Sequence, residues 1–189
     1  MYLCVKFLVF VIMSIVRIKD KTFKTSISEA EIKQRVHDLA VRLNHDMEGK
    51  NPLFLSVLNG AFMFTADLLR EITIPCEVSF VKLASYQGVI STGTVKEVIG
   101  LNVDISDRTI VILEDIIESG RTMHQMLDTL STRRPASIHI CTLFVKPEKI
   151  QEQLDIDYAA FEIPNDFIVG YGLDYDQQGR NLKEIYSLI

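Results

Sequence analysis

Thr109 to Leu113 is an uninterrupted run of β-branched and apolar residues. Such a run is typical of a strand buried on both faces of a parallel sheet, because a strand with one solvated face alternates apolar with polar residues. Leu53 to Leu58 is a second short apolar run, and it ends in Asn59-Gly60, a turn signal. Ser137 to Val145 is a third strand candidate, closed by Lys146-Pro147.

Helical patterns separate these strand candidates. Ser28 followed by Glu31 has the spacing of a capping box, and the apolar residues after it recur at helical spacing as far as about Met47. Ala61 to Glu71 and Met123 to Leu130 are further helix candidates. Strands that alternate with helices predict an α/β domain with a mainly parallel central sheet and right-handed crossovers.

The segment between the second and third helix candidates predicts two more strands and a loop. Cys76 to Leu83 and Val95 to Leu101 are the strand candidates. Between them, the residues from Ser85 to Gly93 are small or polar and show no periodicity, which predicts a mobile loop.

The length of 189 residues fits one domain, and we predict that this domain spans residues 13–189. Met1 to Val16 is mostly apolar but is shorter than the roughly 20 residues that a membrane helix needs, and no small-residue cleavage site follows it. Residues 1–12 are therefore predicted to be an extension or a mis-assigned start, with a first strand near Met13 to Ile18.

The formal net charge of −5 disfavours a general nucleic-acid binder, since such proteins bind phosphates with many Lys and Arg side chains. The three cysteines and four histidines show neither the spacing of a zinc site nor that of a disulfide framework. We therefore expect no nucleic-acid partner and no membrane partner.

The most informative segment is Val111 to Met123, which reads VILEDIIESGRTM. We expect its strand to end at Leu113 and a polar loop to open the next helix. Gly120 lets the backbone turn closely, while Ser119 and Thr122 add hydroxyl donors beside the amides of a helix N-terminus. This arrangement predicts a phosphate site at the carboxyl end of the sheet, where ligands of parallel sheets bind.

Glu114 and Asp115 stand beside this predicted phosphate site. Two carboxylates would repel a bare anion, so their presence calls for hydroxyl groups or a cation between them and the phosphate. Ribose supplies hydroxyls, and Mg²⁺ is the cation that carboxylate oxygens suit. The alternative is an acidic strand end that water merely solvates.

The segment resembles the signature of type I phosphoribosyltransferases, whose loop binds the 5-phosphate of phosphoribosyl pyrophosphate. The resemblance implies that Glu114 and Asp115 face the ribose hydroxyls and the hydration shell of Mg²⁺. The implied phosphate loop consists of Glu118, Ser119, Gly120, Arg121 and Thr122. The family fold adds a small hood, formed by the terminal segments, to the central sheet.

Other segments are similar to the hypoxanthine-guanine branch of that family, and the resemblance covers about residues 25 to 189. The turn containing Asn59 and Gly60 resembles the loop that binds pyrophosphate, although many relatives have a basic residue at position 59. Ser85 and Tyr86 resemble a pair on the flexible loop that closes over the site.

The remaining similarities implicate residues that would bind the purine and the leaving group. Lys146 would donate to the 6-oxo group, which favours oxopurines over adenine; the alternative is a buried lysine paired with a nearby acid. Phe167 and Ile168 belong to the segment FIVGYGLD, where the Phe167 ring offers a surface for the base to stack on. Asp174 would lie near the purine and bind a second Mg²⁺, and Arg180 would clamp pyrophosphate.

The resemblance also implies a general base, which would take a proton from the five-membered ring of the purine. The family usually has an aspartate at the position of Glu118. The glutamate adds a methylene, so we expect a displacement of about 1 Å, which slows the reaction unless another residue compensates.

The resemblance therefore implies a cytoplasmic purine salvage enzyme that transfers the phosphoribosyl group to hypoxanthine or guanine, with Glu118, Lys146 and Arg180 as catalytic residues. The predicted metal ligands are Glu114, Asp115 and Asp174. Two alternatives stay open: a xanthine-preferring enzyme, and a catalytically weak regulator with the same fold. Relatives imply a homodimer or homotetramer.

Overall fold

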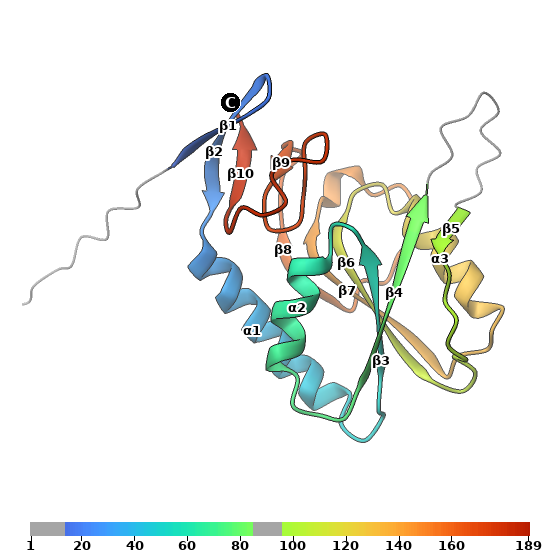
Figure 1. Cartoon of the computed structure of the whole chain (residues 1–189). Helices are drawn as coiled ribbons and strands as arrows, with labels where there is room; N and C mark the ends of the chain where they lie inside the picture. The colour runs from blue at the N-terminus through green and yellow to red at the C-terminus, as the bar shows by residue number, and fades with distance from the viewer. Residues whose placement is uncertain (1–13, 85–95) are drawn as a thin grey trace, which may run out of the picture.

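The computed structural model describes residues 14–84 and 96–189. Within these ranges the chain forms two β-sheets and three α-helices (Figure 1). The elements in chain order are β1 (Ile15–Ile18), β2 (Lys21–Ile27), α1 (Glu29–Asp46), β3 (Leu53–Leu58), α2 (Phe62–Glu71), β4 (Glu77–Ala84), β5 (Lys96–Ile99), β6 (Thr109–Ile117), α3 (Arg121–Ser131), β7 (Ser137–Val145), the 3₁₀ turn η1 (Pro147–Lys149), β8 (Tyr158–Glu162), β9 (Ile168–Val169) and β10 (Ile185–Leu188).

The central sheet has six strands in the order β5-β4-β3-β6-β7-β8. Neighbouring strands among β4, β3, β6, β7 and β8 pair in parallel, and β5 pairs antiparallel to β4. The predicted α/β fold with a mainly parallel sheet is therefore confirmed. The carboxyl ends of β3, β6 and β7 lie at one edge of the sheet, where the sequence predicts the site.

Helices cover both faces of this sheet (Figure 1). Because successive side chains of a strand point to opposite faces, β3 contributes to two cores. Phe54 packs in the cluster that contains the buried residues of α1 and α2. Leu53 and Leu55 pack in the cluster that contains the buried methionines of α3. This burial on both faces explains why β3 and β6 are apolar without alternation.

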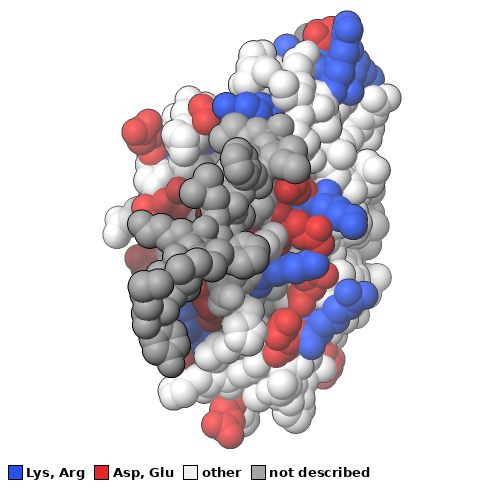
Figure 2. Space-filling view, turned by 90° about the vertical axis from the view of Figure 1, so that its left-hand side faces the viewer, with Lys and Arg blue, Asp and Glu red and all other residues white. Residues whose placement is uncertain are grey.

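Helix α1 begins where the sequence predicts. The Ser28 hydroxyl accepts a hydrogen bond from the backbone N–H of Glu31 at 3.2 Å and so caps the first turn. On the outer surface, Lys33 lies 2.6 Å from Glu29, one helical turn before it. On the side of the molecule that carries α1, Figure 2 shows basic and acidic side chains lying next to one another. Mixed charge of this kind suits a solvated face better than a nucleic-acid surface.

The terminal segments form the second sheet, in the order β1-β2-β10-β9 with antiparallel pairing. A small core of its own holds it together, made of Ile18, Phe23, Val169 and Tyr186. In Figure 1 this sheet stands beyond α1, and the C-terminus lies on it. The predicted hood of terminal segments is therefore confirmed.

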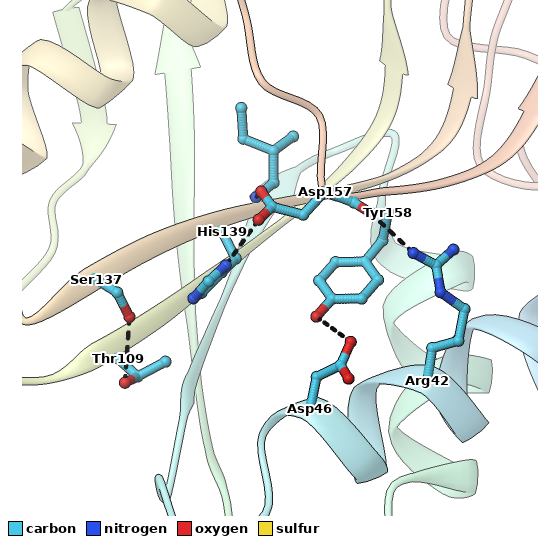
Figure 3. A network of polar contacts seen from close by, with 8 residues as sticks. Arg42, Asp46, Thr109, Ser137, His139, Asp157 and Tyr158 are labelled. Atoms are coloured by element: carbon cyan, nitrogen blue, oxygen red, sulfur yellow. Dashed lines mark hydrogen bonds and ion pairs between the residues drawn. The ribbon is translucent and has the colours of Figure 1, made fainter.

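The amino-terminal edge of the central sheet carries a hydrogen-bond network (Figure 3). Asp157, just before β8, accepts from the backbone N–H of Ile140 at 2.8 Å and lies 2.8 Å from Nδ1 of His139. Arg42 of α1 donates to the backbone carbonyl of Asp157 at 3.1 Å. One carboxylate thus joins β7 to the start of β8, and one arginine joins both to α1.

A second contact in the same view connects α1 to β8. The Tyr158 hydroxyl donates to Oδ2 of Asp46 at 2.9 Å. Burial, and then the hydrogen bond to Asp46, raise the pKa of Tyr158, so the phenol stays protonated as a donor. The Arg42 guanidinium lies 5.0 Å from the centre of the Tyr158 ring, within the range of a cation–π contact.

One boundary differs from the prediction. The strand that begins at Thr109 does not end at Leu113 but runs to Ile117, because Ile116 and Ile117 pair with Phe144 and Val145 of β7. The acidic pair therefore lies within the strand and is held by its ladder. The short strands β2, β8, β9 and β10 were not predicted. The predicted loop from Ser85 to Gly93 lies outside the described residues.

The helices that the structure describes were also compared with the length and apolarity needed to cross a membrane. None of them meets both requirements.

Candidate active site

The site begins with two carboxylates near the end of β6. Glu114 is buried, and its Oε1 accepts from the backbone N–H of Asp115 at 3.2 Å. Oδ1 of Asp115 accepts from the N–H of Ile116 at 3.0 Å. Burial, followed by the charge of the adjacent Asp115, raises the pKa of Glu114 well above its ordinary value. A ligand that brings hydroxyl donors or positive charge to this pair relieves that unfavourable charge.

Three segments that are distant in sequence converge beside Asp115. Gly60, in the turn after β3, lies so close to Asp115 that a Cβ atom at position 60 would overlap the Asp115 carboxylate. A Cβ atom at Gly172 would overlap the carbonyl oxygen of Gly60. The peptide bond between Leu58 and Asn59 in this turn is cis. Glycine at positions 60 and 172 therefore permits the pyrophosphate-type turn, the acidic pair and the FIVGYGLD segment to meet.

The predicted phosphate loop follows β6 and leads into α3. Gly120 has a left-handed φ of +81°, which glycine adopts without strain, and it precedes the first residue of α3. Ser119 Oγ accepts from the N–H of Arg121 at 3.4 Å. A cavity of about 270 Å³ opens here, and its lining residues are Glu114, Ile116, Ile117, Glu118, Ser119, Gly120, Thr122 and Met123. The structure therefore brings most of the predicted phosphate-loop residues to one cavity.

Glu118 connects this cavity to the end of β7. Oε1 of Glu118 forms an ion pair with the ammonium group of Lys146, whose side chain is only 4% exposed. Oε2 of Glu118 lies 3.5 Å from Nζ of Lys149. Burial acts to raise the pKa of Glu118, but the hydrogen bond and charge of Lys146, with those of Lys149, outweigh it and lower that pKa. The buried lysine paired with an acid is thus present, and the acid is the predicted base.

Asp174 and Arg180 also pair with each other. The Arg180 guanidinium lies 2.6 Å from Oδ1 of Asp174 and donates to the Gly172 carbonyl at 2.8 Å. Oδ2 of Asp174 accepts from the N–H of Gln177 at 2.8 Å. The arginine is therefore held near the turn of Gly60, which Gly172 touches.

Phe167 leaves much of its ring open. Its side chain is 44% exposed, and the ring lies edge-on to Tyr175 with 5.9 Å between centroids. Ile168, by contrast, is buried in the core that also contains the residues of α1. The exposed ring is available for stacking, whereas Ile168 anchors the segment that carries the ring.

The predicted metal ligands were tested by their donor chemistry. Glu114, Asp115 and Asp174 supply carboxylate oxygens, which suit Mg²⁺. Among the residues that the structure describes, no three His, Cys, Asp or Glu side chains gather closely enough to hold a metal alone. Such an arrangement fits Mg²⁺ that is bound through one or two carboxylates together with substrate oxygens, as Mg²⁺ is commonly held.

Some predicted residues remain untested, and some contacts were not predicted. Ser85 and Tyr86 lie outside the described residues. Lys149 was not predicted, because its only signal in the sequence is its position three residues after Lys146. Gly172 was noted within FIVGYGLD, but nothing in the sequence indicated that it touches Gly60.

The family model of the phosphoribosyl transferase domain matches residues 25–176. These residues include the end of β6, the loop after it and the start of α3, which line the cavity described above. The chain therefore belongs to the phosphoribosyl transferase domain family.

Particular relatives narrow the comparison. A hypoxanthine phosphoribosyltransferase of Buchnera aphidicola is 43% identical over 171 residues, which are 89% of this chain and 97% of that protein. A solved hypoxanthine-guanine phosphoribosyltransferase from Bacillus anthracis superposes with a TM-score of 0.83 at 37% identity, covering 87% of this chain and 98% of that one. The bifunctional TilS/HprT protein of Listeria monocytogenes is 39% identical over 172 residues, but the chain spans only 26% of its length.

Proposed function

We propose that this chain is a hypoxanthine-guanine phosphoribosyltransferase of purine salvage. It transfers the 5-phosphoribosyl group of phosphoribosyl pyrophosphate to hypoxanthine or guanine, giving IMP or GMP and pyrophosphate. The observation that carries the proposal is the position of Glu118, which lines the cavity of the phosphate loop and also pairs with the buried Lys146. The relatives that the chain matches over most of its length support the same activity.

The phosphoribosyl half of the substrate would occupy the end of β6. The backbone amides at the start of α3, with the Ser119 and Thr122 hydroxyls and Arg121, would bind the 5-phosphate. The ribose hydroxyls would donate to the Glu114 and Asp115 carboxyl groups; burial and the charge of Asp115 raise the pKa of Glu114, and hydroxyl donors there would favour its charged form. This binding fixes the anomeric carbon relative to the incoming base.

The purine would stack on the exposed ring of Phe167 and place its 6-oxo group at Lys146. A lysine ammonium only donates hydrogen bonds. It therefore pairs with the carbonyl oxygen of an oxopurine and not with the amino group of adenine, which is also a donor. Glu118 would take the proton from the five-membered ring as the nitrogen attacks the anomeric carbon. Of the two partners of the ion pair, Lys146 would thus recognise the base and Glu118 would deprotonate it.

The leaving pyrophosphate would lie near the turn of Asn59 and Gly60, within reach of Arg180. Asp174 holds the Arg180 guanidinium at 2.6 Å, so binding of pyrophosphate would compete with this pair. Glu114, Asp115 and Asp174 would hold Mg²⁺, which supplies positive charge that stabilises the leaving group. We propose Mg²⁺, a homodimer or homotetramer and a cytoplasmic location as predictions from the resemblance.

A catalytically weak regulator that binds nucleotides is a second candidate. The specific observation in its favour is that Lys146 and Glu118 form an ion pair with each other, so neither side chain is open to the purine until that pair separates. An ion pair that the purine fails to open would leave a protein that binds phosphoribosyl pyrophosphate without turnover.

The test is an assay of the purified full-length chain with phosphoribosyl pyrophosphate and Mg²⁺, in parallel with hypoxanthine, guanine, xanthine and adenine. We expect rapid nucleotide formation with hypoxanthine or guanine, and turnover of adenine at least roughly a hundredfold slower. Faster turnover of xanthine would identify a xanthine enzyme. A folded protein that binds phosphoribosyl pyrophosphate but turns over none of the bases would contradict the proposal and favour the regulator.

A further inference from the structure

The Glu118 carboxylate lies between two lysines that belong to one turn. Lys146, at the end of β7, pairs with Oε1, and Lys149, at the end of η1, lies 3.5 Å from Oε2. The backbone N–H of Lys149 donates to the carbonyl of Lys146 at 3.0 Å, so the turn holds the two lysine backbones close to each other. Each carboxylate oxygen therefore has its own cation.

The same turn is attached to the phosphate loop on both sides of Glu118. The N–H of Lys146 donates to the carbonyl of Ile117 at 3.0 Å, and the N–H of Gln151 donates to the carbonyl of Ser119 at 3.0 Å. Residues 117 and 119 flank Glu118 in the chain. The turn and the loop are thus held in register, and the position of Lys149 opposite Glu118 follows from these backbone bonds.

The two lysines differ in exposure and in their roles in the proposed reaction. Lys146 is 4% exposed, and the purine would draw its hydrogen bond away from Glu118. Lys149 is 37% exposed and lies on the outer side of the carboxylate. When Lys146 turns to the purine, Lys149 is the cation that still holds Glu118. A glutamate left without either lysine would be free to adopt several rotamers, and its position at the purine nitrogen would be lost.

We propose that Lys149 is a positioning residue of the reaction, which holds Oε2 of Glu118 so that Oε1 keeps its place when Lys146 transfers its hydrogen bond to the purine. This inference rests on the proposed function. It also gives the glutamate a role, because its two carboxylate oxygens each meet one of the lysines. Lys149 is then the residue that compensates for the extra methylene of Glu118, which the sequence otherwise predicts to slow the reaction.

Other titratable groups near the loop are engaged elsewhere or are acids, which cannot replace a lysine beside Glu118. Arg121, at the start of α3, lies 4.0 Å from Glu152. Glu114, earlier on β6, has a raised pKa. Among the described residues, Lys146 and Lys149 are the groups that lower the pKa of Glu118. Loss of Lys149 should therefore raise that pKa and move the acid limb of the pH–rate profile to higher pH.

The test compares Lys149→Met with Lys149→Arg in the full-length chain. Lys50→Met is the matched control, because Lys50 is an exposed lysine between α1 and β3. We expect Lys149→Met to lower kcat roughly tenfold to a hundredfold, to leave the KM for phosphoribosyl pyrophosphate unchanged, and to move the acid limb of kcat upward. Lys149→Arg should recover most of the rate, and Lys50→Met should match the wild type.

A double-mutant cycle separates positioning from a general structural effect. In a Glu118→Gln background, Lys149→Met should cause no further loss of kcat, because the carboxylate that it positions is gone. A Lys149→Met variant as active as Lys50→Met, or an equal loss in both backgrounds, would overturn the role of Lys149 alone. A folded wild-type chain without turnover would instead overturn the proposed function and this inference with it.

Discussion

The two edges of the central sheet, where the strands begin and where they end, differ in how their polar side chains are paired. At the amino-terminal edge, each of the main polar groups faces a partner of complementary character: Asp157 accepts from β7, and Tyr158 donates to Asp46 (Figure 3). At the carboxyl edge, two acids, Glu114 and Asp115, stand side by side, and the buried Lys146 pairs with Glu118, which lines the cavity. One edge stabilises the fold, and the other holds groups whose best partners are ligand atoms.

The difference shows how one sheet can separate stability from function. Pairing between β6 and β7 holds the backbone at both edges, so the side chains of each edge can take different roles. A change at the amino-terminal edge should therefore cost stability and leave activity intact, and a change at the carboxyl edge should do the reverse. The following variants test that separation.

The largest effect is expected from Gly60→Ala. The new Cβ would overlap the Asp115 carboxylate, so the acidic pair or the pyrophosphate turn must move. We expect kcat/KM to fall by roughly a hundredfold or more, because displacements of about 1 Å cost that much. Gly49→Ala is the control: its φ is +75° with open space around it, so it should lower stability by about 1 kcal/mol and leave kcat/KM unchanged. Equal activity of the two variants would contradict the account.

Asp157→Ala should have the converse effect at the other edge. It removes the acceptor of Ile140 N–H and His139, which should lower the free energy of unfolding by about 2–3 kcal/mol and Tm by roughly 4–10 °C. The measurement is thermal denaturation beside a kcat assay, with Asp128→Ala as a control on the surface of α3, where the side chain is 72% exposed. A loss of kcat in the folded Asp157→Ala variant would break the separation of the two edges.

Glu118→Asp should reduce the rate instead of restoring it. The shorter side chain cannot hold both Lys146 and Lys149, so we expect kcat to fall by roughly tenfold while stability changes little. Steady-state kinetics beside a denaturant melt measures both. An aspartate variant faster than the wild type would show that the glutamate is a handicap and that Lys149 does not compensate for it.

The smallest effect is expected from Asp46→Asn. The hydrogen bond from Tyr158 is the main cause that lowers the pKa of Asp46 below its ordinary value. A lowered folded-state pKa stabilises the fold at neutral pH, and this contribution is lost as the pH falls through that value. We expect a loss of about 0.5 kcal/mol at pH 7, since the carboxylate is partly exposed, which disappears in acid. In a Tyr158→Phe background the pH-dependent difference should shrink, because only His45 and Arg42 then lower the pKa of Asp46; an unchanged difference would assign it to those groups alone.

Most of the central fold could be predicted because its signals are local. The apolar runs at Leu53 and Thr109 predict buried strands, and the Ser28 cap predicts the start of α1. The end of β6 could not be predicted, because Ile116 and Ile117 join the ladder through partners on β7 that lie far away in sequence. The short strands of the hood likewise depend on pairing between the two ends of the chain.

The candidate site was predicted in its residue types more fully than in its contacts. Spacing indicated a phosphate loop around Gly120 and a polar group at each strand end. It did not indicate that Glu118 bridges two lysines, or that Gly60 touches both Asp115 and Gly172. These contacts arise from tertiary packing, for which a single sequence carries no periodic signal.

In the proposed reaction, Lys146 recognises the 6-oxo group of the base while Glu118 accepts the proton of the purine ring. The most direct measurement is kcat/KM for hypoxanthine and for adenine with the wild type and with Lys146→Met, alongside the Kd for phosphoribosyl pyrophosphate. The account predicts that the preference for hypoxanthine falls by roughly a hundredfold in the variant while that Kd is unchanged. An unchanged preference in a folded Lys146→Met variant would contradict it.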